Sequence, residues 1–197
     1  GEFADLPHFA RWAMEAGQAA LQILPINEMP PAERSPYSAM TAMALDPLYL
    51  SLPDVPDFGG LGGVTAFDAA DEAALAAIQQ SDRVRYVAVR ALKERWLRRS
   101  WDRFLRMEVS RGTQRSARFD RFCADEAWWL DDYALFRALH ALHEEQRWQD
   151  WPEPLSQFEP KAVAQARSAL HVEATYRKYL QWLAAEQWAE AKRLAWP

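Results

Sequence analysis

The chain has 197 residues, of which 50% are hydrophobic and 13% aromatic, so it can bury one sizeable core and does not belong to the disordered class. Its net charge of -5 provides no broad basic surface, so nucleic acid is not an expected partner. The lone Cys123 excludes an internal disulfide framework, and no run reaches the roughly 18 apolar residues that span a bilayer, so we expect a soluble cytoplasmic protein without a membrane partner.

The first predicted elements are a helix and a short strand. Asp5 can cap an amphipathic helix that Gly17 is available to end. The apolar run from Ala20 to Leu24 is bounded by Gly17 and Pro25, and it has the length and the flanking residues of a buried strand. We therefore expect a strand that leads into the polar segment after it.

That polar segment, from Leu24 to Pro47, is rich in proline and hydroxyl side chains. Pro36 fixes its own φ and pushes Ser35 into extended geometry, so Ser35, Pro36 and Tyr37 form a stiff unit that presents a hydroxyl and a phenol. This combination suits a sugar, because the C–H face of the sugar stacks on a ring while its hydroxyls need hydrogen-bond partners. The alternative is an ordinary proline-rich surface turn, and the residues alone leave it open.

Beyond the loop the sequence is almost entirely helical. A second short apolar run covers 48–52, and the glycine-rich run 58–63 lacks the lysine that a phosphate-binding loop needs. Apolar residues at helical spacing predict helices over 71–80, from Asp82 to about 108, after Gly112, from Asp125 through 142, and from Lys161 to 194 as one helix or two joined ones.

Short motifs follow one another along nearly the whole chain. They are Glu15-Ala16-Gly17-Gln18, Gln22-Ile23-Leu24-Pro25, Ser35-Pro36-Tyr37-Ser38-Ala39 with Asp46-Pro47, Trp129-Leu130-Asp131-Asp132-Tyr133, Trp148-Gln149-Asp150-Trp151-Pro152, and Gln181-Trp182 with Gln187-Trp188. In content and order this series resembles the amylomaltase family, also called 4-alpha-glucanotransferase or disproportionating enzyme.

The resemblance implies an α/β fold class. The chain would hold part of a (β/α)8 barrel, namely its first helix, second strand and second helix, together with a large helical insertion, so that it is predominantly α. The expected boundaries are a barrel segment with the substrate loop at 1–52, a helical insertion at 53–159 and a barrel helix at 160–197.

The resemblance also implies an activity, the transfer of α-1,4-glucan units between maltooligosaccharides by a retaining double displacement. α-1,4-Glucans and maltooligosaccharides are the partners it implies, and neither a cofactor nor a metal is expected. The family's catalytic carboxylates lie beyond its Gln-Trp motif, hence beyond Pro197. No catalytic residue is therefore assigned to this chain, which we expect to be inactive alone.

Residue by residue, the resemblance assigns substrate binding to Ser35, Pro36 and Tyr37, because the family's Ser-Pro-Tyr motif lies in its substrate cleft. Tyr86 stands where some members place an aromatic residue of a second glucan-binding groove. The partner aromatic of that groove appears here as Ala32, and Asp46 replaces the usual asparagine. These departures indicate a divergent subgroup.

Other interpretations stay open beside the transferase. The chain could be a non-catalytic helical module that binds a glucan or a protein, or part of an amylase-type hydrolase in which water replaces the acceptor sugar. His140 and His143 lie three apart beside Glu144, but without a third ligand a solvated helix face is expected rather than a metal site. The Trp128-Trp129 pair is expected to pack in the core.

Overall fold

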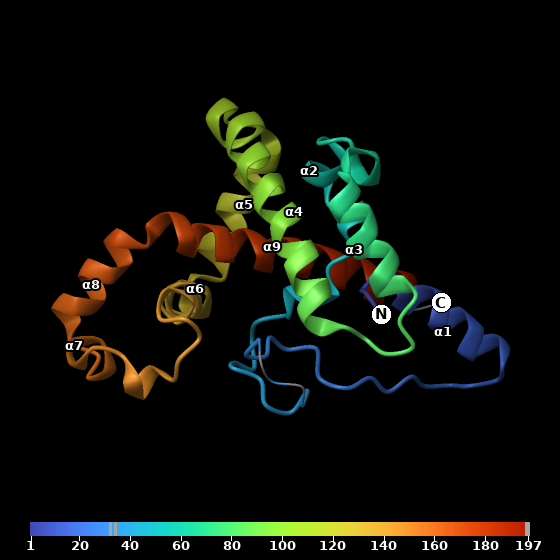
Figure 1. Ribbon diagram of the computed structural model, residues 1–197, viewed down its shortest axis with the longest axis horizontal. Helices are drawn as coiled ribbons and strands as arrows, with labels where there is room; N and C mark the ends of the chain where they lie inside the picture. The colour runs from blue at the N-terminus through green and yellow to red at the C-terminus, as the bar shows by residue number, and fades with distance from the viewer. Residues whose placement is uncertain (32, 34, 196–197) are drawn as a thin grey trace.

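The computed structural model describes residues 1–31, 33 and 35–195, and one long helix organises this part of the chain (Figure 1). This helix, α9 (His171–Ala195), runs through the middle of the molecule. Helix α1 (Asp5–Glu15) packs beside its C-terminal part, and α6 (Ala127–Leu142) packs beside its N-terminal part. No helix of the described ranges is long and apolar enough to cross a membrane.

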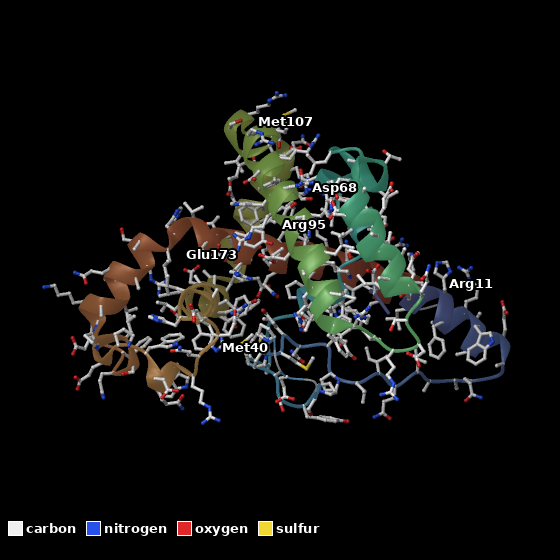
Figure 2. The ribbon with its side chains drawn as sticks, in the orientation of Figure 1. Arg11, Met40, Asp68, Arg95, Met107 and Glu173 are labelled. Carbon is white, nitrogen blue, oxygen red and sulfur yellow. The ribbon has the colours of Figure 1, made fainter. Side chains whose placement is uncertain are left out.

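The remaining helices pack on this frame. Helix α4 (Tyr86–Met107) contacts α9 and α3 (Ala69–Gln79), and α5 (Gln114–Asp125) contacts α6 and α9. Arg95 lies on the side of α4 that faces α3, where it pairs with Asp71 (Figure 2). The other elements are α2 (Pro56–Gly59), α7 (Glu153–Ser156), α8 (Pro160–Ala169) and the 3-10 turns η1 (Pro47–Tyr49), η2 (Leu52–Asp54), η3 (Gly63–Ala66), η4 (Val109–Arg111) and η5 (Trp148–Asp150).

The main core is an aromatic cluster where α4, α5 and α9 meet. The ring of Tyr179 lies 5.1 Å from that of Phe104 and 5.2 Å from that of Trp101, and Phe119 and Trp182 pack against them. Burying each such ring stabilises the fold by about 1.5–3 kcal/mol. The Tyr179 hydroxyl donates a hydrogen bond of 2.7 Å to the buried carboxylate of Asp57, so the one polar atom of this ring is also satisfied.

The predominantly α character predicted from the sequence is confirmed, whereas the predicted strand is not. Residues 20–24 are extended, but they form no ladder with any other described residue. Leu21, Ile23 and Leu24 are 37%, 43% and 61% exposed. A strand is stabilised by hydrogen bonds to a neighbouring strand and by burial of its apolar face, and this segment has neither. The expectation of a partial barrel stays a prediction.

Helix boundaries differ from the sequence prediction at several ends. Helix α1 begins after Ala4, without a side-chain cap, and the Asp5 carboxylate instead accepts the Glu2 N–H. Helix α4 begins at Tyr86 rather than after Asp82. Where the sequence predicts one helix or two joined ones after Lys161, the structure has two, α8 and α9.

Trp128 corrects the expectation that both tryptophans of its pair are buried. Trp128 is 71% exposed, while Trp129 is partly buried and its ring lies 5.7 Å from that of Tyr133. Neighbouring residues of a helix point about 100° apart, so only one of the two faces the interior.

Candidate functional site

The proline-rich loop closes on itself at its base. Asn27 and Leu45 form an isolated antiparallel bridge, the Glu28 N–H donates to the Ala44 carbonyl at 3.0 Å, and the Asp46 N–H donates to the Ile26 carbonyl at 2.9 Å. These bonds hold the entry and the exit of the loop side by side. The segment between them therefore projects from a fixed base.

Ser35, Pro36 and Tyr37 lie in a turn at the outer part of this loop. The Ser38 N–H donates to the Ser35 carbonyl at 3.0 Å, with Pro36 at the second position of the turn, where its fixed φ is favoured. Tyr37 is 76% exposed, and its ring has no aromatic partner within the described ranges. The turn thus presents the phenol to solvent, while Ser35 and Pro36 are partly covered.

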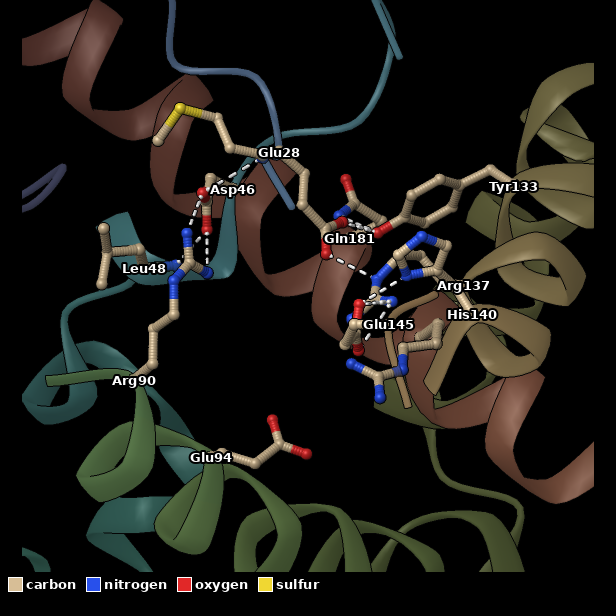
Figure 3. Close-up of polar contacts among 12 residues, drawn as sticks. Glu28, Asp46, Leu48, Arg90, Glu94, Tyr133, Arg137, His140, Glu145 and Gln181 are labelled. Carbon is tan, nitrogen blue, oxygen red and sulfur yellow. Dashed lines mark hydrogen bonds and ion pairs between the residues drawn. The ribbon is translucent and has the colours of Figure 1, made fainter. Parts of the chain in front are cut away.

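Glu28 anchors the entry of the loop to helix α6. Its carboxylate is buried, accepts the hydroxyl of Tyr133, and accepts the Nε–H of Arg137 at 2.9 Å (Figure 3). Burial raises the pKa of Glu28, and Arg137 opposes that shift. Burial and the adjacent carboxylate raise the pKa of Tyr133 well above its usual value, so the phenol keeps its proton and serves as the donor.

Asp46 anchors the other end of the loop to helix α4. Its carboxylate is 0% exposed and accepts a bidentate pair from Arg90, with Nη1 to Oδ1 at 3.0 Å and Nη2 to Oδ2 at 2.7 Å (Figure 3). It also accepts the Leu48 N–H at 2.9 Å and so caps turn η1. Charge-assisted, bidentate bonds of this kind are among the strongest in proteins.

Two glutamines of α9 hold the chain that follows. The Gln181 side chain accepts the Leu45 N–H at 2.9 Å and donates to the Leu45 carbonyl at 2.8 Å. Gln187 does the same with Ser51, at 2.8 and 2.9 Å. Each side-chain amide therefore makes the two backbone hydrogen bonds that a residue of a neighbouring strand would otherwise make. The Gln-Trp motifs found in the sequence serve here to clamp extended backbone onto α9.

A charged cavity of about 330 Å³ lies between this loop and helices α4, α6 and α9. Its polar lining carries both signs and comprises Glu28, Arg90, Lys93, Glu94, Arg137, Glu145 and Arg177. Glu28 and Asp46 are both committed to arginine partners inside the protein. A retaining glycosidase needs two carboxylates that flank a bound sugar about 5 Å apart, so these acids fit the role of holding the loop rather than that of reacting.

His140 corrects the expectation of a solvated histidine face. It is 7% exposed, and its Nδ1 lies 2.5 Å from a carboxylate oxygen of Glu145. Glu145 follows the end of α6 with a φ of 61°, so the chain folds back there and brings its carboxylate to Arg137 as well. His143 stacks on Trp151, with ring centroids 5.2 Å apart.

Tyr86 lies apart from the Ser35-Pro36-Tyr37 turn. It is 39% exposed at the start of α4 and lines a hollow of about 640 Å³ together with Tyr49, Phe67 and other residues. The lining of that hollow includes none of the three turn residues. The structure therefore does not bring all the predicted substrate-binding residues together. Ala32, the position of the missing groove partner, lies outside the described residues.

Sequence reasoning missed the groups that fix the loop. Glu28 and Asp46 flank the prolines, and Asp46 precedes Pro47, which is a signal for a capping carboxylate. Nothing in the local pattern identifies Arg137 or Arg90 as their partners, because both lie on helices whose charges otherwise indicate a solvated face.

Comparison with known proteins gives a consistent result. A family model described as 4-alpha-glucanotransferase matches residues 1–196. The chain is 33% identical to a 4-alpha-glucanotransferase of Thermus thermophilus, in an alignment that covers 93% of this chain and 34% of that protein. It is 29% identical to a 4-alpha-glucanotransferase of Chlamydia caviae, in an alignment that covers 99% of this chain and 35% of that protein. Its fold is similar to that of an amylomaltase from Streptococcus agalactiae solved in complex with acarbose, with a TM-score of 0.79, 22% identity and coverage of 99% of this chain and 37% of that one. The chain spans about a third of the length of the curated relatives it matches.

Proposed function

This chain belongs to the 4-alpha-glucanotransferase family, and from that membership we propose that the natural polypeptide which contains it transfers α-1,4-glucan units between maltooligosaccharides. The reaction would be a retaining double displacement through a covalent glycosyl-enzyme, with the 4-hydroxyl of a second glucan as acceptor. The catalytic carboxylates would come from outside residues 1–197. We further propose a cytoplasmic location.

The role of this chain in that reaction is to bind and orient the glucan. The observation that carries it is the exposed Tyr37 ring, held on a loop whose two ends are fixed by the buried carboxylates Glu28 and Asp46. A ring presented on a rigid support loses little entropy when a sugar stacks on it. Ser35 and Pro36 belong to the same turn, and Tyr86 serves a separate glucan contact.

The proposal includes the arrangement of the chain. Residues 1–52 and 160–197 would belong to the barrel, and residues 53–159 would form the helical insertion beside the cleft. The exposed apolar side chains of residues 20–24 support this arrangement, because an extended apolar segment is stable when neighbouring strands cover it. The barrel would supply those strands.

The activity is tested by incubating the natural polypeptide with maltotriose. Transfer gives free glucose together with maltooligosaccharides longer than the substrate. Glucose and maltose without longer products would instead identify a hydrolase, since water would then be the acceptor. Binding of maltotriose without any turnover would identify the non-catalytic module.

The role of Tyr37 is tested by two replacements. We expect Tyr37→Ala to lower kcat/KM for maltotriose about tenfold, which corresponds to roughly 1.4 kcal/mol. The melting temperature should stay nearly unchanged, because the ring is 76% exposed. Tyr37→Phe keeps the stacking face and should retain most of the activity. A Tyr37→Ala variant that melts several degrees lower, or that keeps full activity, would contradict the assignment.

A further inference from the structure

A second aromatic hollow lies far along the chain from the proline loop. Helix α6, turn η5, helix α7 and the start of α8 enclose about 470 Å³, a volume typical of small-molecule sites. These elements form the lobe at the left of Figure 1. A small separate core built on Leu135, Leu139 and Trp151 forms the floor of this hollow.

Two large rings at this hollow have no ring partner and no hydrogen-bond partner among residues 1–31, 33 and 35–195. Trp148 is 48% exposed, and its indole N–H has neither a hydrogen bond nor a ring contact among the residues described. Phe158 is 71% exposed and likewise contacts no other ring there. Trp151 shows the contrast, since its N–H donates to the Gln146 carbonyl and its ring stacks on His143. Folding alone gives no reason to leave Trp148 and Phe158 exposed at one hollow.

Three polar residues, Asp132, Ser156 and Gln157, line the otherwise apolar hollow, and only Asp132 among them is charged. Gln157 offers an amide without a partner in the described part of the chain, and the Ser156 hydroxyl donates to the Glu153 carbonyl while its lone pairs stay free. The carboxylate of Asp132 is paired with Arg167 at 2.9 Å. A lining without a free cation does not favour a phosphate or another anion. A purely apolar ligand would leave the Gln157 amide without a hydrogen-bond partner.

We propose that this hollow binds a neutral oligosaccharide, with sugar rings stacked on Trp148 and Phe158 and sugar hydroxyls hydrogen-bonded to Gln157. The combination of exposed rings with uncharged hydrogen-bonding groups matches the alternating apolar and hydroxyl surfaces of a sugar. That the sugar is an α-glucan rests on the proposed function. Helix α6 links this site to the loop, because Asp132 and Phe136 line the hollow while Tyr133 and Arg137 hold Glu28.

Such a site lets the polypeptide hold a polymer at one place while it acts at another. When one part of a glucan is bound at this hollow, the effective concentration of its free end at the cleft rises without any new contact there. The benefit grows with the length of the glucan, because a short oligosaccharide cannot reach both sites.

The test is binding of β-cyclodextrin and of glycogen to the natural polypeptide, by calorimetry and by mobility in glycogen-containing native gels. We expect Trp148→Ala and, separately, Phe158→Ala to weaken binding about five- to tenfold. Trp128→Ala is the matched control, because Trp128 is 71% exposed on the same helix α6 but does not line the hollow, and it should bind like the wild type.

Several outcomes would overturn the proposal. One is wild-type affinity in both the Trp148→Ala and Phe158→Ala variants. Another is a hollow that takes up an anilinonaphthalene dye but no glucan, which would make it an apolar docking surface. A third is a Trp148→Ala variant that melts at a much lower temperature, in a polypeptide that binds no glucan. That result would mean that other side chains of the polypeptide pack on Trp148 and fill the hollow. Maltotriose turnover is measured separately, so failure of the proposed function would be seen independently of these results.

Discussion

The pair formed by Asp46 and Arg90 offers a quantitative test of how the loop is held. Replacing Arg90 by Met leaves a carboxylate that is 0% exposed without its cation. Removing one partner of a fully buried ion pair costs about 3–5 kcal/mol. Arg90 keeps 22% of its side chain exposed and borders the cavity of about 330 Å³, so water can partly hydrate the orphaned carboxylate. We therefore expect a loss of about 2–3 kcal/mol.

The assay is urea unfolding followed by circular dichroism. With a slope of about 2 kcal/mol per molar urea, the expected loss lowers the midpoint by about 1–1.5 M. Arg193→Met is the matched control, because Arg193 pairs with Glu190 at side-chain exposures of 67% and 53%, and a solvated pair contributes little. That control should leave the midpoint unchanged.

A second replacement separates the buried charge from the lost contacts. Asp46→Asn in the Arg90→Met background removes the orphaned charge, while its amide oxygen can still accept the Leu48 N–H. We expect this double variant to recover about half of the lost stability, as a double-mutant cycle would report. The reasoning is refuted if Arg90→Met lowers the midpoint no more than Arg193→Met, or if Asp46→Asn lowers it further.

Three other predictions concern single groups. Gln181→Leu leaves the partly buried backbone of Leu45 without its amide partner, so it should destabilise the fold by about 1–3 kcal/mol in the same urea assay. No loss would show that water replaces the amide. The hydrogen bond from Arg98 lowers the pKa of Glu173 below its usual 4.5, although burial opposes this shift. The stability that Glu173 contributes is therefore complete above pH 4.5 and is lost as the pH falls through the folded-state pKa. Glu173→Gln should flatten the fall of the urea midpoint between pH 7 and pH 3. Burial raises the pKa of Cys123 to about 11, so a disulfide reagent at pH 8 should label this thiol slowly until urea unfolds the chain, and fast labelling of the native protein would contradict the burial.

The amino-acid sequence by itself determined the local features of this protein. Its helical periodicity predicted nearly all of the long helices, and Gly112, with a φ of 59°, followed by Thr113, which caps α5, marked a boundary that the structure confirms. Proline also restricts its neighbours locally, and the structure has a hydrogen-bonded turn at Ser35, Pro36 and Tyr37. These features depend on residues close together in the chain, so a sequence pattern carries them.

Tertiary structure alone decided what holds the candidate site. The bond from Tyr133 to Glu28 joins residues 105 positions apart, and the Gln181 clamp on Leu45 joins residues 136 apart. Such pairs exist only because α6 and α9 pack side by side beneath the loop. The same dependence explains the unpaired segment 20–24, since a strand forms only when another strand supplies its hydrogen bonds, and periodicity cannot report whether one is there.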